Sequence, residues 1–279
     1  MNKTRLALST LVLACACAPA PQPPREPETT VRAPDVVFVP TPFRVVDAML
    51  AVSGVGPGDV LYDLGSGDGR IVIAAAKRFG IKAIGIDIDP KRIEESNFNA
   101  DTAGVRHLVE FRNADLFATD LRPASVITLY LLPALNVRLR PKLFEELRPG
   151  SRVVSNSFDM GDWKADSILT VDARVVYYWV MPAGIAGTWD IVMATQSGER
   201  THEVQFEQQY QAITAARSSG GTAIRNARVR GDTVRFDIVG GATGASAATR
   251  FEGTVAGSTM SGTWSSAGIS GSWRASRRD

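Results

Sequence analysis

The stretch Asp63-Leu-Gly-Ser-Gly-Asp-Gly-Arg70 decides the fold of the region around it. An apolar run, Val60–Tyr62, precedes it and an apolar, alanine-rich run follows, which predicts a strand, a tight turn and a helix. Gly65, Gly67 and Gly69 let the backbone turn sharply and approach a ligand closely, because they have no Cβ. The helix that follows points its unpaired N–H groups at the turn. The stretch therefore predicts a binding site for a nucleotide-like cofactor.

The spacing of the glycines separates this turn from other nucleotide-binding motifs. The dinucleotide fingerprint G-x-G-x-x-G, counted from Gly65, would need a glycine at Arg70, and no P-loop run follows a strand. What remains is D-x-G-x-G-x-G, which resembles the first motif of class I S-adenosylmethionine (SAM)-dependent methyltransferases. SAM has no pyrophosphate, and its α-amino group would suit the acidic surroundings of Asp63.

The chain after the turn continues to alternate between strand and helix. Four further strands are expected, at residues 82–87, 109–115, 125–132 and 151–157. Asp87 follows Gly65 by about 20 residues, the spacing at which such folds hold the ribose hydroxyls. In the family that the glycine motif resembles, an acid at the position of Asp115 contacts the adenine amino group. The pattern predicts a doubly wound, Rossmann-like α/β sheet, with solvated strand ends and a purely structural turn as the alternative interpretation.

A segment before the glycine strand narrows the resemblance. Phe38–Pro42 followed by Val45–Leu50 resembles the N-terminal motif of a class I subgroup. This subgroup includes mitochondrial protein-lysine methyltransferases that act on an ATP synthase subunit and on the nucleotide translocase. The resemblance covers about residues 36–163 and implies SAM as the cofactor. It also implies that Pro40 and Thr41 lie across the open side of the cofactor, with a rigid entry loop as the alternative.

Candidates for the acceptor site follow the fourth expected strand, at the sheet edge where such folds bind ligands. Tyr130 and Asn136 are the catalytic candidates, with packing or capping roles as the alternative. The Asn-Pro-Pro-Tyr motif of amide and adenine methyltransferases is absent, which argues against those substrates. Methyl transfer mainly requires that donor and acceptor be held close and aligned. We expect SAM-dependent transfer to an amine, with a protein lysine as the leading acceptor and a small molecule as the alternative.

The composition excludes several other classes of function. With 279 residues, 44% hydrophobic and 22% charged, the chain is typical of a globular protein. Its net charge is +2 and its basic residues are scattered, so we expect no nucleic-acid partner. The chain has two cysteines, Cys15 and Cys17, which lie near the N-terminus, and two histidines, His107 and His202. We therefore expect no metal site, no thiolate nucleophile and no hydrolase triad.

Residues 1–34 predict export. A basic start, a short apolar run and small residues are typical of a secretory signal, and the run is too short to span a bilayer. Val12–Cys15 also resembles a bacterial lipoprotein cleavage site, which would make Cys15 the lipidated first residue. Residues 18–34 are rich in proline and predict a disordered tether. We expect the bacterial cell envelope, with membrane contact only through this anchor, or the cytoplasm if the signal is not used.

The α/β pattern weakens before it ends. Between Ser157 and Ala173 the expected crossover helix is poorly formed. The apolar run Arg174–Met181 predicts a late strand that pairs antiparallel with a neighbour. We therefore place the methyltransferase-like domain at residues 35–183.

Residues 184–279 have a different character. Period-two alternation with Gly- and Ser-rich turns predicts half-buried strands at residues 188–193, 201–207, 233–238, 250–254 and 271–274. This pattern predicts a small antiparallel sheet or barrel. Its expected core aromatics are Trp189, Phe236, Phe251, Trp264 and Trp273. No motif assigns a function to this domain.

Export conflicts with the need for SAM, which is not expected to be made outside the cytoplasm. Three hypotheses stay open: an active methyltransferase, an exported binding protein that keeps the pocket for another ligand, and an envelope interaction protein whose β domain is the working part. The acids Asp63, Asp87 and Asp115 favour the first hypothesis. Export favours the other two.

Overall fold

The computed structural model describes residues 37–218, 222–240 and 248–278. The predicted signal, the lipid site at Cys15 and the Pro-rich tether lie outside the described residues. In the part of the chain that is described, no helix is both long and apolar enough to cross a membrane.

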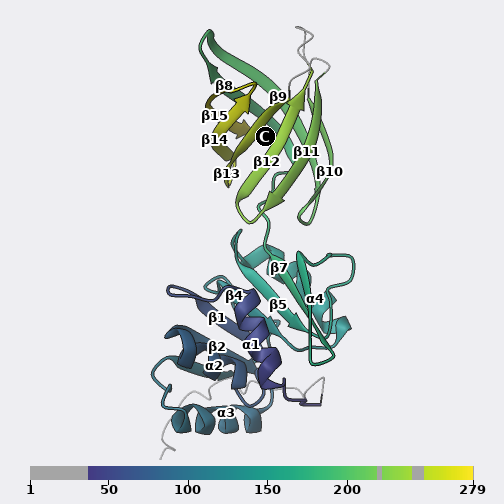
Figure 1. Cartoon of the computed structure of the whole chain (residues 1–279). Coiled ribbons are helices and arrows are strands. Elements are labelled where there is room, and N and C mark those ends of the chain that lie inside the picture. Colours follow the sequence, from purple (N-terminus) through teal and green to yellow (C-terminus); the bar gives the residue numbers. More distant parts are fainter. Residues whose placement is uncertain (1–36, 219–221, 241–247, 279) are drawn as a thin grey trace, which may run out of the picture. The chain divides into compact units, whose positions relative to one another are not determined.

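The first part of the chain folds into a seven-stranded sheet with helices on its faces (Figure 1). The strands are β1 (Val60–Leu64), β2 (Lys82–Asp87), β3 (Val109–Asn113), β4 (Val126–Leu129), β5 (Arg152–Asn156), β6 (Ser167–Val171) and β7 (Arg174–Val180). Their order is β3-β2-β1-β4-β5-β7-β6. Strands β1 to β5 pair in parallel, and β7 pairs antiparallel with β5 and β6. The order confirms the predicted α/β sheet and its antiparallel late strand.

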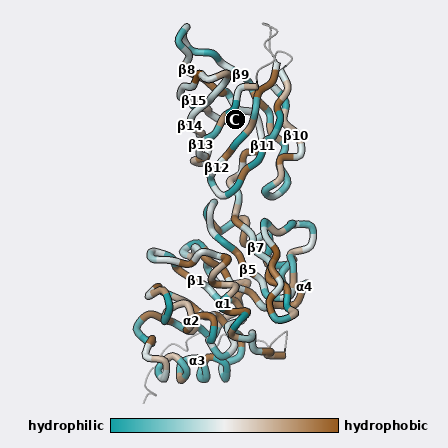
Figure 2. The backbone as a smooth tube through the Cα atoms, in the orientation of Figure 1, coloured by the Kyte–Doolittle hydropathy of each residue, from teal (hydrophilic) through white to brown (hydrophobic). Residues whose placement is uncertain are grey.

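Helices cover both faces of this sheet. They are α1 (Phe43–Val52), α2 (Arg70–Phe79), α3 (Pro90–Thr102) and α4 (Pro133–Glu146). Buried residues of α1, α2 and α3 pack in one cluster with Val126 and Val154, whereas Leu139 and Leu143 of α4 pack in another with Ile127. Neighbouring strand residues point to opposite faces, so central strands such as β2 and β4 contribute to both cores. In Figure 2 the strands around β5 and β7 carry hydrophobic colour, while α3 is largely hydrophilic.

A hairpin stands where a crossover helix was expected. After β5 the chain forms only an isolated bridge between Met160 and Trp163, and then turns into β6 and β7. Trp163 is fully buried, and its ring centroid lies 5.4 Å from that of Trp179. The segment is therefore anchored by an aromatic contact rather than by helical periodicity.

The C-terminal part is a closed antiparallel barrel (Figure 1). Its strands are β8 (Gly187–Thr195), β9 (Gly198–Gln209), β10 (Ala212–Ser218), β11 (Ala223–Arg230), β12 (Thr233–Val239), β13 (Thr249–Ala256), β14 (Thr259–Ser266) and β15 (Ile269–Arg277). The barrel closes where β8 pairs with β15. All five predicted core aromatics are buried, and Phe236 stacks on Phe251 with ring centroids 4.9 Å apart. The sequence thus predicted the architecture and its core.

Three of the eight barrel strands, β10, β11 and β14, were not predicted. Strand β14 places only Met260 and Trp264 in the core, and its other positions are Ser, Thr and Gly. Strands β10 and β11 are built mainly from alanine and arginine. Their inward positions are too small or too sparse to produce a clear period-two signal.

Candidate active site

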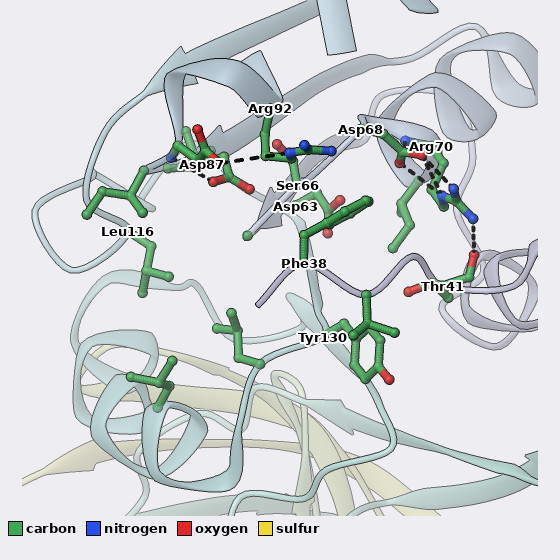
Figure 3. A pocket seen from close by; sticks show the side chains of 18 of the residues that line it. Phe38, Thr41, Asp63, Ser66, Asp68, Arg70, Asp87, Arg92, Leu116 and Tyr130 are labelled. Atoms are coloured by element: carbon green, nitrogen blue, oxygen red, sulfur yellow. Dashed lines mark hydrogen bonds and ion pairs between the residues drawn. The ribbon is translucent and has the colours of Figure 1, made fainter. Parts of the chain in front are cut away.

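A cavity of 640 Å³ opens where β1, β2 and β4 end. Doubly wound sheets bind ligands at this edge. The cavity is lined by the glycine turn, the ends of β2 and β4, the loop after β3, the start of α4 and an N-terminal segment. In the view of Figure 3, Phe38 of that segment lies between Ser66 and Tyr130. The cavity therefore combines residues from distant parts of the first domain.

The glycine turn has a backbone that only glycine adopts easily. Gly65, Gly67 and Gly69 have φ of 83°, 54° and 79°, in the left-handed region. A Cβ on Gly67 would lie 2.2 Å from a ring carbon of Phe38. The N–H of Gly67 donates to Asp87 Oδ2 at 2.8 Å. Gly65 lines the cavity, whereas Gly67 and Gly69 shape the turn behind it.

Asp63, at the end of β1, is a buried carboxylate without a countercharge. The residue is 2% exposed, and Thr128 Oγ1 donates to its Oδ1 at 2.7 Å. No basic side chain of the described residues pairs with it. Burial raises the pKa of Asp63 to about 7; the Thr128 hydrogen bond opposes this rise, and the charges of Asp87 and Asp68 add to it. A ligand that brings an ammonium group would supply the missing partner.

Two further acids continue the row that Asp63 begins. Asp87 ends β2 and Asp115 follows β3, and the strands β1, β2 and β3 are neighbours in the sheet. Asp87 Oδ1 accepts from the Asp89 N–H at 2.9 Å, and Asp115 Oδ1 accepts from the Phe117 N–H at 2.8 Å. All three acids line the cavity. They offer acceptors along one wall, in the order that an amino group, a ribose and an adenine ring would need.

The N-terminal segment closes one side of the cavity. Thr41 is 4% exposed and lines the cavity. Its carbonyl oxygen accepts from Arg70 Nη1 at 2.8 Å, and its Oγ1 accepts from Asn156 Nδ2 at 3.3 Å. Pro40 is exposed and is not among the lining residues, whereas Phe38, two residues before it, is. The segment therefore contributes Thr41 and Phe38 rather than Pro40.

Tyr130 stands at the end of β4 with a firmly held side chain. It is half-buried and lines the cavity. Arg174 Nη1 donates to its hydroxyl oxygen at 2.7 Å. The ring of Phe158 lies nearly parallel, at a centroid distance of 6.2 Å and an angle of 20°. This position keeps Tyr130 as the acceptor-site candidate.

Asn136, the second catalytic candidate, lies elsewhere. It is fully buried and is not part of the cavity lining. Its Nδ2 donates to Ser155 Oγ and to the carbonyl oxygens of Phe158 and Asp159, each at 3.2 Å. Asn136 thus holds the loop after β5 in place, and its position does not support contact with an acceptor.

Several lining residues were missed by sequence reasoning. Ser66 and Asp68 belong to the glycine stretch itself, and Phe38 belongs to the N-terminal motif, so a signal for them existed. Within the described structure, Ser66 Oγ is buried and has no hydrogen-bond partner. Arg174 reaches Tyr130 from β7, 44 residues away, and no local pattern could have indicated that contact.

This chain is similar to several known methyltransferases. A family model described as ANTKMT methyltransferase domain matches residues 63–167. A protein-lysine N-methyltransferase of Saccharolobus islandicus is 42% identical over 153 residues, which are 53% of this chain and 95% of that protein. An adenine nucleotide translocase lysine N-methyltransferase of Mus musculus is 33% identical over 48% of this chain and 58% of its own length, so the chain spans little more than half of that relative.

One solved structure is also similar. The crystal structure of an RNA methyltransferase from Salinibacter ruber, in complex with S-adenosyl-L-homocysteine (SAH), is 54% identical with a TM-score of 0.52. The match covers 53% of this chain and 96% of that one.

Proposed function

The chain belongs to the class I SAM-dependent methyltransferases, close to the protein-lysine methyltransferases, and from this premise we propose that it methylates the side-chain amine of a lysine in a protein. The observation that carries the choice of acceptor is the 42% identity to a protein-lysine N-methyltransferase across 95% of its length. The residues of the cavity are consistent with this proposal.

The site fits SAM by its unmet polar groups. Asp63 has no countercharge, and the buried Ser66 Oγ has no partner among the described residues. Asp63 would hold the amino group, Asp87 the ribose hydroxyls, and Asp115 the adenine end. When bound, SAM supplies a methyl group activated by its attachment to a sulfonium. The protein needs to add position rather than new chemistry.

The acceptor side suits an amine that must lose its proton. Phe38, Leu131 and Leu135 line the cavity with apolar surface near the polar Tyr130. Such surroundings disfavour an ammonium ion and lower the pKa of an entering amine. A neutral amine carries the lone pair that the transfer requires. The site would therefore suit a lysine whose amine enters the apolar side of the cavity.

RNA is the second candidate acceptor. It is favoured by the 54% identity to the Salinibacter ruber protein, whose crystal structure is that of an RNA methyltransferase. It is opposed by the net charge of +2, which offers little attraction for a phosphate backbone.

The experiment that separates the two supplies methyl-labelled SAM with one class of acceptor at a time. One reaction contains a lysine-containing peptide library, a second contains total RNA, and each is repeated with an Asp87→Ala variant. We expect label on peptides, with mass spectrometry placing it on lysine side chains, and none with the variant. Label on RNA alone would replace lysine by RNA as the acceptor.

We also propose that the protein works in the bacterial cell envelope, tethered through lipidated Cys15. Support comes from the Val12–Cys15 pattern after a short apolar run. Incorporation of labelled palmitate by the wild type, and its loss in Cys15→Ser, is the expected result. A wild type without label that fractionates with cytoplasmic markers would contradict the export proposal and remove the conflict over SAM supply.

A further inference from the structure

We propose that Arg174 is a positioning residue for the methyl acceptor: it holds the hydroxyl of Tyr130 so that the remaining lone pair of that oxygen receives an N–H of the acceptor amine. The inference rests on the proposed function, because it assumes an acceptor that carries an N–H group.

The contact between the two residues leaves one side of the hydroxyl available. Arg174 Nη1 lies 2.7 Å from the Tyr130 oxygen, and its guanidinium carbon lies 5.6 Å from the ring centroid. One lone pair of the oxygen is therefore occupied, and within the described residues the second accepts no hydrogen bond. Tyr130 lines the cavity and Arg174 does not. Arg174 can thus act on a bound acceptor only through Tyr130.

The surroundings keep the Tyr130 ring from turning away. Phe158 stacks beside it, and the Phe158 carbonyl oxygen accepts from the buried Asn136. Ser157 has a φ of 67°, and its N–H donates to the Val175 carbonyl oxygen at 2.7 Å, next to Arg174. A non-glycine residue in the left-handed region persists only where its neighbours enforce it. The loop after β5 and the start of β7 therefore form one braced support for the hydroxyl.

This support matters for the direction of attack. A neutral amine has two N–H groups and one lone pair, and an N–H donated to the Tyr130 oxygen fixes the direction of the lone pair. The nitrogen lone pair forms the new N–C bond while the methyl–sulfur bond breaks and its electron pair stays on sulfur. The extra proton then leaves the methylated nitrogen for water. Orientation of this kind is the main contribution a protein makes to such a displacement.

The test compares Arg174→Met and Arg174→Lys with Tyr130→Phe and the double variant Tyr130→Phe/Arg174→Met. Arg44→Met is the matched control, since Arg44 is 81% exposed and pairs with Asp172 instead. The first readout needs no acceptor: the Cζ resonance of Tyr130 in protein labelled with ¹³C-tyrosine, assigned by its loss in Tyr130→Phe. We expect Arg174→Met to move this resonance and Arg44→Met to leave it in place.

The second readout is kinetic, with the lysine peptide that the library assay selects. Arg174→Met should lower kcat/KM for the peptide about tenfold, the effect of one lost hydrogen bond, with SAH affinity by calorimetry unchanged. Arg174→Lys should recover part of the loss, because lysine can still donate to the hydroxyl. In the Tyr130→Phe background the Arg174 substitution should add nothing.

The outcomes separate this inference from the proposed function. An unmoved Tyr130 resonance, a loss of SAH affinity, or effects that add in the double variant would overturn the role of Arg174 even if lysine is methylated. A moved resonance together with methylation of RNA only would overturn the lysine proposal. It would also overturn the part of the inference that concerns a lysine amine.

Discussion

Asp63 in the sheet and Asp237 in the barrel are both buried carboxylates, with 2% and 5% exposure, yet their surroundings differ. Asp237 accepts from Asn226 Nδ2 at 2.6 Å and pairs with Arg250 at 3.4 Å. Among the described residues, Asp63 accepts one side-chain hydrogen bond, from Thr128, and has no basic partner. One carboxylate is satisfied by the protein itself and the other is not.

The difference indicates where a ligand belongs. A buried charge is costly unless it is paired and hydrogen-bonded. The barrel meets this requirement for Asp237 with its own side chains, as expected for a structural residue. The sheet provides no such partner for Asp63, and burial raises the pKa of this residue to about 7. Such an imbalance is typical of a functional site, and it lies in the cavity at the carboxyl ends of the parallel strands, where doubly wound sheets bind ligands.

Among the changes that test this comparison, substitution of Asp63 should have the largest effect, and the effect should be on SAH affinity. Asp63→Asn keeps an oxygen that can accept from Thr128 and removes the charge. We expect affinity for SAH to fall by about 3 kcal/mol, more than a hundredfold, because the ligand's ammonium would be buried without a counterion. Calorimetry on the folded variant measures this directly. Affinity within threefold of wild type would place the amino group elsewhere in the cavity.

The same variant should become more stable as it loses binding. The folded pKa of Asp63, about 7, lies above the unfolded value of 3.8, so the folded state binds protons more tightly. The stabilising contribution of protonated Asp63 is therefore full below pH 3.8 and is lost as the pH rises through 7. At pH 8, ligand-free Asp63→Asn should exceed wild type by roughly 2–3 kcal/mol in unfolding free energy. Urea unfolding at pH 5 and pH 8 tests the sign.

The ionisation of Asp63 should also make the affinity for SAH depend on pH. The ammonium of SAH favours ionised Asp63, so wild-type affinity should rise as the pH increases from 6 to 8, with proton release on binding near pH 7. Calorimetry in buffers of different ionisation enthalpy counts the released protons. Asp63→Asn should show neither effect over this range, and a pH-independent wild-type affinity would contradict the assignment.

The sequence predicted the acids of the cavity better than the long-range contacts around Tyr130. Asp63, Asp87 and Asp115 could be found because each ends or follows a strand that local periodicity reveals, and parallel strands end at one edge. Arg174 and Phe158 could not be found, because they reach Tyr130 from segments that no local pattern connects. The position of Asn136 outside the cavity lining could not be found for the same reason: proximity to Tyr130 in sequence does not show which face of α4 a side chain occupies.

Substitution of Asp237 in the barrel tests the other carboxylate of the comparison and should change the unfolding free energy by a smaller amount. Asp237→Asn keeps an acceptor for Asn226 but loses the charge that pairs with Arg250. Since Arg250 is half exposed, we expect a loss of only about 1 kcal/mol in unfolding free energy. SAH affinity should not change. A gain in stability, as expected for Asp63→Asn, would mean that Asp237 is no better satisfied than Asp63.

Removal of the whole barrel should have the smallest effect on the cofactor site. Every residue that lines the cavity lies between Val37 and Leu135, and the last strand of the sheet, β7, ends at Val180. The Salinibacter ruber structure corresponds over 96% of its length to only 53% of this chain, so that relative has no counterpart to nearly half of this chain. A chain that ends at Ala183 should therefore fold and bind SAH within about twofold of the full-length affinity, a difference below about 0.5 kcal/mol. Circular dichroism establishes the fold and calorimetry the affinity. If the shortened chain has an intact spectrum but a much weaker affinity, the barrel takes part in organising the site. Asp63 and Asp237 would then belong to two parts of the chain that depend on each other.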